Sequence, residues 1–359
     1  MKKYNIYYRR DGRFEGRVSR GKDKDGKRLF SYFFGHTREE VEQKIDTSRK
    51  SEQNNCCATT VGQLFTEWFQ NIRFRIKEST AANYLMKAEK HIIPEFSDIN
   101  ASEIDESDIC RFIESRQKKG LSNRYISDIL VMLKSVFRYA SNKYQFCNPL
   151  DSIPLPKSKK TEVTLLNNDE QQKLQHYIVK NQNTTTLGIA LAMSTGIRIG
   201  ELCALQWCDI DLEKRILTVK KTIQRIKAIN GQSKTKLIIT EPKSESSKRK
   251  IPIPECIMPV LEKFKGNNNE YLISGAINPT EPRTLQYRFV SILKNADLPS
   301  VHFHSLRHMF ATKCMKLGFD VKSLSEILGH SSVEVTLNRY VHSDFDQKRQ
   351  FMKRISLNF

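Results

Sequence analysis

Hydrophobic and polar positions alternate at the start of the chain. Residues 4–8 follow this period of two, which is typical of a strand, and turn signals come before two more predicted strands at 14–18 and 28–34. Thr37 is a suitable N-cap for a helix that follows the third strand. We therefore predict that residues 1–50 form a three-stranded sheet closed by one helix.

The spacing changes to that of amphipathic helices over residues 61–146. Ser79 is expected to open a second helix and Ser107 to cap a third, which should stop at Gly120. The first and fourth helices carry apolar stripes, formed by Leu64, Phe65, Trp68, Phe69 and Ile72 and by Ile126, Ile129, Leu130, Leu133, Val136 and Phe137. We interpret these stripes as the core of a helical domain.

Two polar segments are expected to separate three domains. Residues 50–60 form the first, and the second is a stretch at 149–160, rich in proline and lysine, that should be extended, solvated and able to lie along a polyanion. From residue 161 onward we expect a larger, mainly helical domain with a β insertion, whose strands are predicted at 216–223, 237–239 and 248–253. The predicted fold class is thus multidomain and mainly α with small β elements.

Charge and composition narrow the class of partner. The chain has 359 residues and a formal net charge of +20, from 60 Lys and Arg against 40 Asp and Glu. This surplus favours a polyanionic partner, and we prefer nucleic acid to anionic lipid because no apolar run approaches the roughly 18 residues of a membrane span. The first residues lead into a polar pattern rather than an apolar signal core, so we expect a cytoplasmic protein. The eight cysteines lack the spacing of a metal site or a disulfide framework, and we interpret them as reduced thiols.

Positive charge is concentrated in two parts of the chain. Residues 1–30 contain eleven Lys and Arg against four acidic residues, and residues 214–250 contain twelve against two. A basic three-stranded sheet suits insertion into a DNA groove, although a solvated surface fits the composition equally well. Candidate contacts to DNA are Arg9, Arg13, Arg17, Arg28, Arg73, Arg75, Lys77, Arg124, Lys157 and Lys159.

Six residues of the last domain form a set suited to attack on a phosphodiester without a metal: Arg198, Lys243, His304, Arg307, His330 and Tyr340. Attack on phosphorus builds negative charge on the equatorial oxygens, and the planar guanidinium can bind two of them at once. The histidines can donate to the same oxygens or transfer a proton. Tyr340 would be the nucleophile; a free tyrosine with a pKa of about 10 is only ~0.1% ionised at pH 7, so it needs cationic neighbours. Lys243 would protonate the leaving hydroxyl.

Members of this set also have ordinary structural interpretations. Arg198 could simply pair with Glu201. His304 and His308 have the i,i+4 spacing that can hold zinc, but a zinc protease would need Glu where Ser305 stands. We expect His308 to pack away from the substrate. The joint occurrence and order of the set, rather than any single member, indicate DNA cleavage.

Three motifs carry a resemblance to a known family: Thr-Gly-Ile-Arg-Ile-Gly-Glu at 195–201, His-Ser-Leu-Arg-His at 304–308, and Leu-Gly-His at 328–330 followed by Tyr340. Over nearly its whole length the chain resembles the tyrosine recombinases, or phage-type integrases, in particular those of temperate phages and conjugative transposons. The resemblance implies that the six residues above are the catalytic set and that Glu201 supports them. For the lysine, Lys248 and Lys250 are neighbouring alternatives to Lys243.

The resemblance also implies an architecture. Residues 1–50 are expected to be an arm-type DNA-binding domain, residues 61–146 a core-binding domain that clamps DNA, and residues 161–359 the catalytic domain with a C-terminal exchange tail. In the family such tails pack onto a neighbouring protomer, so we expect a homotetramer on two DNA duplexes. Packing of the tail onto its own domain stays open as an alternative.

The expected function is site-specific integration and excision of a mobile element through a 3′-phosphotyrosyl intermediate. This linkage keeps the energy of the broken bond, so no ATP, metal or other cofactor is expected, and the sequence has no Gly-x4-Gly-Lys-Ser/Thr loop. Expected partners are double-stranded DNA with core-type and arm-type sites, an excision factor and a host DNA-bending protein. A type IB topoisomerase and a DNA-binding regulator without cleavage activity are the alternative functions.

Overall fold

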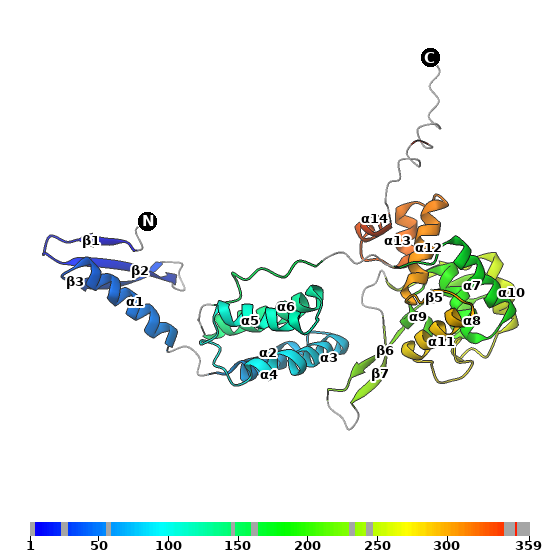
Figure 1. The fold of residues 1–359 in the computed structure, drawn as a ribbon, viewed down its shortest axis with the longest axis horizontal. Helices are drawn as coiled ribbons and strands as arrows, with labels where there is room; N and C mark the ends of the chain where they lie inside the picture. Colours follow the sequence, from blue (N-terminus) through cyan, green and yellow to red (C-terminus); the bar gives the residue numbers. More distant parts are fainter. Residues whose placement is uncertain are drawn as a thin grey trace, which may run out of the picture. The chain divides into compact units, whose positions relative to one another are not determined.

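The computed structural model describes residues 4–22, 28–54, 59–144, 148–158, 164–229, 234–241, 247–340 and residue 349. The chain divides into two compact units, Met1–Lys160 and Thr161–Phe359. Helices predominate in both units, and each unit contains small β elements (Figure 1). The predicted fold class is therefore confirmed.

The first part of unit 1 is an antiparallel sheet with a helix across one face (Figure 1). Its strands are β1 (Ile6–Tyr8), β2 (Phe14–Lys22) and β3 (Arg28–Gly35), which pair in chain order. The helix α1 (Arg38–Asn54) follows β3. The glycine at position 16 lets α1 approach closely, because a Cβ atom there would lie 2.6 Å from Val41. The Thr37 hydroxyl accepts from the Glu40 amide at 3.1 Å, so the predicted cap is confirmed. α1 continues to Asn54, past the predicted end of this domain.

The second part of unit 1 is helical. Its elements are α2 (Val61–Ile72), α3 (Glu78–Lys87), the π-helical turn η1 (Ala88–Ile92), α4 (Ile93–Phe96), α5 (Glu106–Lys118) and α6 (Asn123–Tyr144). The predicted apolar stripes lie on α2 and α6, which pack against each other, and all their residues are buried except the half-buried Ile72. The helical periodicity therefore identified the core of this part correctly.

Two predicted helix starts are wrong, that of α5 by two residues and that of α3 by one. Asp105 rather than Ser107 caps α5: its carboxylate accepts from the Asp108 amide at 2.9 Å, so the helix begins earlier. α3 begins at Glu78, ahead of Ser79, where an acidic side chain suits the positive end of the helix dipole. The predicted stop at Gly120 is confirmed, because its φ of 77° allows the left-handed turn after α5.

The segment at 148–158 packs on α6, contrary to the prediction of a solvated linker. Leu150 and Ile153 are buried. Three α6 side chains donate to carbonyl oxygens of the segment: Asn123 Nδ2 to Lys157 at 2.8 Å, Ser127 Oγ to Pro156 at 3.1 Å, and Lys134 Nζ to Ile153 at 2.7 Å. The carbonyls of Asn148 and Leu150 are paired within the segment, and the row of polar side chains on α6 satisfies those of Ile153, Pro156 and Lys157 in its extended part.

Unit 2 surrounds its largest core with helices and two small sheets. Its helices are α7 (Asn168–Lys180), α8 (Thr184–Thr195), α9 (Ile199–Cys203), α10 (Met258–Lys263), α11 (Pro282–Asn295), α12 (His304–Lys316), α13 (Val321–Leu328) and α14 (Val333–Tyr340). Its strands are β4 (Ile210–Asp211), β5 (Ile216–Val219), β6 (Thr222–Lys227), β7 (Thr235–Thr240) and β8 (Arg249–Pro252). The single-turn 3₁₀ segment η2 (Trp207–Asp209) precedes β4, and η4 (Glu255–Ile257) lies between β8 and α10.

The β insertion forms two separate sheets. β5 pairs with β4 and β8, whereas β6 and β7 form a hairpin of their own. The single strand predicted at 216–223 is therefore wrong: it consists of β5 and the start of β6, separated at Lys220 and Lys221. Alternation indicates which face of a strand is buried, but it does not reveal that the pairing partner changes.

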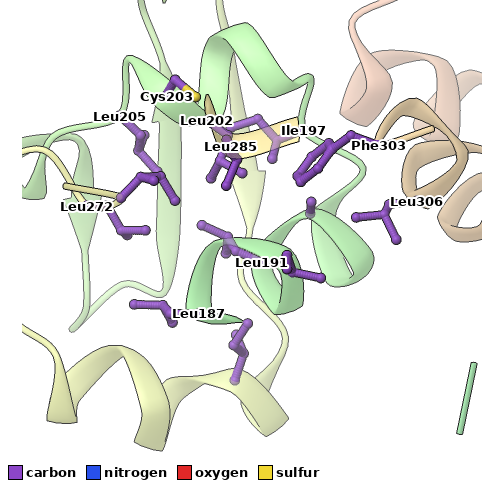
Figure 2. Close-up of a cluster of buried hydrophobic side chains, with 14 of the residues drawn as sticks. Leu187, Leu191, Ile197, Leu202, Cys203, Leu205, Leu272, Leu285, Phe303 and Leu306 are labelled. Atoms are coloured by element: carbon purple, nitrogen blue, oxygen red, sulfur yellow. The ribbon is translucent and has the colours of Figure 1, made fainter. Parts of the chain in front are cut away.

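The core of unit 2 fixes the ends of the helices that carry the candidate site. Figure 2 shows its buried side chains, among them Leu191 of α8, Leu202 of α9, Leu285 of α11 and Leu306 of α12. Burying a leucine side chain contributes about 1.5–3 kcal/mol, so this cluster holds α8, α9 and α12 firmly together. No helix in the described part of the chain is long and apolar enough to cross a membrane.

Candidate active site

The first arginine of the predicted set lies in the tight turn between α8 and α9. Gly196 ends α8 with a φ of 66°, and a Cβ atom at this position would lie 2.5 Å from the Phe310 ring. Arg198 is the N-cap residue of α9, and its Nη1 donates to Glu201 Oε1 at 2.8 Å. Its backbone amide donates to Glu201 Oε2 at 3.1 Å. The pairing with Glu201 that the sequence suggested is therefore present, and it fixes one end of the guanidinium of a side chain that is still 35% exposed.

The second arginine connects this turn to the end of α13. Arg307 lies in the first turn of α12 and is only 2% exposed. Its Nη1 donates to the carbonyl oxygen of Gly196 at 2.8 Å, and its Nη2 donates to that of Leu328 at 2.6 Å. Two parallel bonds from one planar fork leave the guanidinium little freedom to rotate.

Three arginines meet at the carboxyl end of α13. The carbonyl oxygens of its last residues each accept from a different guanidinium: Ile327 from Arg249 at 2.6 Å, Leu328 from Arg307 at 2.6 Å and Gly329 from Arg198 at 2.8 Å. The last carbonyls of a helix have no partners within the helix and carry its negative dipole end, so cationic donors are favoured there. His330 follows directly, and the site thus brings Arg198, Arg307 and the backbone of His330 together.

Arg249, at the start of β8, is a member of this cluster that the sequence reasoning missed. Its guanidinium donates to both Glu201 oxygens, from Nη2 at 2.9 Å and from Nη1 at 3.2 Å. A further bond from Nη1 reaches the Ser247 carbonyl at 3.1 Å. Residues alternate between buried and exposed along β8, with Arg249 and Ile251 on the buried side. That alternation was the available signal: an arginine in phase with the buried isoleucines of a predicted strand must have a buried partner.

Glu201 is the acidic centre of the arginine cluster. Burial tends to raise the pKa of this carboxyl, but the hydrogen bond and charge of Arg249, followed by those of Arg198, outweigh it and hold the pKa below its usual range. The carboxylate is therefore ionised at neutral pH. It neutralises part of the charge of two adjacent guanidiniums, which allows both to be packed this close.

The two predicted histidines have different surroundings. His304 opens α12, and its ring packs edge-on against that of His308 with centroids 4.7 Å apart. His308 is buried, as expected of a packing residue, whereas its predicted direction away from the substrate stays a prediction. His330 Nδ1 lies 2.7 Å from Thr336 Oγ1 of α14, within hydrogen-bond distance. The sequence reasoning did not single out Thr336, and nothing in the pattern distinguishes it from the other polar residues of this helix.

The remaining members of the set are only partly described. Lys243 lies outside the described residues, so its predicted position on a hairpin tip stays a prediction. Tyr340 is the last residue of α14, and its backbone is helical. Its side chain lies outside the description, so its approach to the arginine cluster also stays a prediction. The exchange tail predicted after Tyr340 falls beyond the described part of the chain, apart from residue 349.

Three of the four predicted DNA contacts of residues 1–50, namely Arg9, Arg13 and Arg17, lie around the open face of the sheet, opposite α1. Arg17 places its guanidinium 3.6 Å from the centroid of the Phe30 ring, and Arg9 and Arg13 lie 5.5 and 5.9 Å from that of Phe34. The Arg28 side chain lies outside the description. All three arginines are exposed, and Arg9 and Arg13 also pair with the carboxylates of Glu15 and Asp11, respectively.

The other predicted DNA contacts of unit 1 are also on its surface. Arg73, Arg75, Lys77, Arg124 and Lys157 are exposed, whereas Lys159 lies outside the described residues. The turn between α2 and α3 additionally exposes 84% of Phe74, beside the guanidinium of Arg73. The sequence reasoning missed Phe74; the signal was a large apolar residue placed between two arginines, out of phase with the buried stripe of α2.

Comparisons with known proteins identify the family. The phage integrase family model matches residues 163–347, and the model of the phage integrase N-terminal SAM-like domain matches residues 60–115. A protein described as tyrosine recombinase XerC-like, from Caldanaerobacter subterraneus subsp. tengcongensis, is 30% identical over 371 residues, which cover 94% of each chain. The chain belongs to the phage integrase family and is a tyrosine-type site-specific recombinase.

Two solved structures show the same fold with DNA bound. The Tn1549 transposon integrase in complex with a circular intermediate DNA is 25% identical, with a TM-score of 0.69 over 83% of this chain and all of that chain. A lambda integrase tetramer bound to a Holliday junction is 20% identical, with a TM-score of 0.61 over 95% and 97% of the two chains.

Proposed function

We propose that this recombinase cleaves DNA with Tyr340, forms a 3′-phosphotyrosyl intermediate, and thereby integrates and excises a mobile element. The observation that carries the proposal is the cluster at the end of α13, where Arg198 and Arg307 are held by backbone carbonyls next to His330. Guanidiniums that are fixed in advance need not reorganise when charge develops on a phosphate. Such preorganised electrostatic stabilisation is usually the largest single contribution to catalysis.

The proposed step starts with attack by the Tyr340 hydroxyl oxygen on phosphorus. The bond from phosphorus to the 5′-oxygen breaks as the new tyrosyl bond forms, and the phenolic proton leaves to a base. Arg198 and Arg307 bind the non-bridging oxygens, on which negative charge accumulates. His304 and His330 donate to the same oxygens or accept the proton. Lys243 protonates the 5′-oxygen as it leaves, and a 5′-hydroxyl of a second strand later reverses the reaction.

Within this function, Glu201 and Arg249 orient Arg198 rather than touch the DNA. Glu201 holds both the backbone amide and the guanidinium of Arg198. Arg249 in turn donates hydrogen bonds to Glu201, to the Ile327 carbonyl at the end of α13 and to the carbonyl of Ser247. Ser247 ends the segment that contains Lys243. Arg249 therefore ties together three stretches of chain that each contribute a proposed catalytic residue.

We further propose a division of DNA binding among three domains. Residues 1–50 bind arm-type sites through the open face of the sheet, where exposed arginines stack on aromatic rings. Residues 61–146 bind the core-type site, with Arg73, Arg75, Lys77 and Arg124 at phosphates. Residues 161–359 carry out the chemistry and supply the exchange tail. Assembly is proposed to be a homotetramer, as in the lambda integrase complex with a Holliday junction. An excision factor and a host DNA-bending protein are proposed accessory partners in the cytoplasm of a bacterial host.

A nicked suicide substrate tests the proposal. When the short 5′-hydroxyl fragment diffuses away, religation stops and the wild-type protein should accumulate as a covalent complex visible on a denaturing gel. Tyr340→Phe should bind the same DNA with unchanged affinity and form no adduct. An undiminished adduct in that variant would assign the nucleophile elsewhere, and binding without any adduct in the wild type would favour the regulator. Relaxation of supercoiled DNA that lacks a recombination site would favour the topoisomerase.

A further inference from the structure

The helix that carries Tyr340 is anchored by a polar side chain. Among the α14 side chains that the structure describes, those of residues 333–337, only Thr336 is buried, with no exposed surface. Its aliphatic neighbours Val333, Val335 and Leu337 are each more than a third exposed. This is the reverse of an ordinary amphipathic helix, in which the aliphatic side chains would be buried and the threonine exposed.

The buried hydroxyl of Thr336 is directed at the ring of His330. Its Oγ1 lies 2.7 Å from His330 Nδ1. A hydrogen bond at one ring nitrogen sets the plane of an imidazole and selects which protonated form is favoured, so that the other nitrogen, Nε2, has a defined role. The carboxyl end of α13 fixes the backbone of His330, because its amide donates to the Ser325 carbonyl at 3.1 Å. The Thr336 contact adds a restraint on the ring itself.

The position of Thr336 in α14 connects this restraint to the nucleophile. Thr336 precedes Tyr340 by four residues, which is about one helical turn, so the two residues lie on the same side of the helix. In the docked α14 of this structure, Thr336 contacts His330. Any displacement of α14 would therefore remove the hydroxyl from His330 together with the helix that carries Tyr340.

We propose that Thr336 is a positioning residue that couples the docking of the Tyr340 helix to the orientation of His330. The inference rests on the proposed roles of His330 and Tyr340, and it adds that these two residues become competent together. A protomer whose α14 is displaced would then lack an aligned histidine as well as a nucleophile. Cleavage by such a partly assembled site would be suppressed both by the missing nucleophile and by the misaligned histidine.

The test compares Thr336→Val, which keeps the shape of the side chain but removes the hydroxyl, with Thr336→Ser, which keeps the hydroxyl. The single-turnover rate of adduct formation on the suicide substrate, at saturating protein, should fall roughly tenfold or more in the valine variant, as expected for loss of one bond to a group that acts in the transition state. The serine variant should recover most of the rate. DNA affinity should be unchanged in both. Val335→Thr makes the reverse exchange on the exposed side of the same helix and should leave the rate unchanged.

A double-mutant cycle separates positioning from mere packing. If Thr336 acts through His330, Thr336→Val should have no further effect in a His330→Ala background, whereas independent structural effects would multiply. Multiplicative effects, or a serine variant as slow as the valine variant, would overturn the inference. A wild-type protein that forms no adduct would instead contradict the proposed function itself. Thermal unfolding of each variant checks that the rate is compared among folded proteins.

Discussion

Arginines serve two opposite purposes in the two units of this protein. In unit 2, Arg249 and Arg307 are buried, and both, like Arg198, donate to carbonyl oxygens at the end of α13. In unit 1, Arg17 is exposed, and its guanidinium lies 3.6 Å from the centroid of the Phe30 ring. The unit 2 guanidiniums are fixed in direction by backbone carbonyls before any DNA arrives, whereas Arg17 is exposed and supported on one face by an aromatic ring.

This difference indicates what each region can contribute. Fixed guanidiniums suit a transition state, because they do not have to reorganise when charge develops on a phosphate. Adaptable guanidiniums suit ground-state binding to a polyanion, where charge matters more than direction and the effect depends on salt. The same residue type should therefore respond differently to the same substitution in the two units, and the predictions below use that contrast.

The largest difference should come from exchanging arginine for lysine in both regions. Arg307→Lys keeps the charge but cannot make two parallel bonds to Gly196 and Leu328, so adduct formation should fall by roughly 10²–10³ with little change in DNA affinity. Arg17→Lys should leave the cleavage rate unchanged and alter affinity by less than about threefold, because a flexible cation can still meet a phosphate. Rates on the suicide substrate and binding titrations measure both. Equal losses in the two variants would contradict the contrast.

The next effect concerns the carboxylate between the arginines. Glu201→Gln should lower the free energy of unfolding by about 3 kcal/mol at pH 7, because it leaves two closely packed guanidiniums without their counter-charge. The folded-state pKa of Glu201 is depressed, so its contribution is complete above the unfolded value of about 4.3 and is lost as the pH falls through the lower folded value. Denaturant unfolding should therefore show the gap between wild type and variant narrowing below pH 4.3. A gap that is independent of pH down to acid unfolding would show that the ion pair is not its cause.

The smallest effect should come from removing one exposed arginine. Arg17→Ala deletes a cation stacked on Phe30 and should weaken binding to an arm-type site about threefold to tenfold. The slope of log affinity against log salt should decrease by about 0.9, as expected for the loss of one phosphate contact. Affinity for a core-type site provides the internal control and should not change. An Arg17→Ala protein that loses core-site affinity to the same extent would contradict the separate role of the sheet.

Local patterns were sufficient for much of the fold. The stripe of α2 and the alternation of the first strands each reflect a single buried face, which spacing along the chain reveals directly. The row of donors that holds the segment at 148–158 was not predictable in this way. It depends on α6 side chains meeting carbonyls about 20 to 35 residues away, and a lysine such as Lys134 looks the same in sequence whether it is solvated or bonded.

The candidate site also contains residues that local motifs identify and residues whose role depends on contacts distant in the sequence. Motif spacing was enough to select Arg198 and Arg307, and the structure brings both to the end of α13. It was not enough for Arg249, whose partner Glu201 lies 48 residues earlier. Thr336 was missed for a different reason, since its significance comes from burial among exposed aliphatic residues. The alternation along β8 marks Arg249 as buried without naming its partner, and the burial of Thr336 has no signature in the sequence.

The identity of the residue joined to DNA tests the account most directly. The covalent complex trapped on a suicide substrate can be digested with protease and nuclease, and the peptide that retains a nucleotide can be sequenced by mass spectrometry. The account predicts one modified peptide, with the nucleotide attached through its 3′-phosphate to the oxygen of Tyr340. A nucleotide on any other residue, or a linkage through a 5′-phosphate, would contradict it.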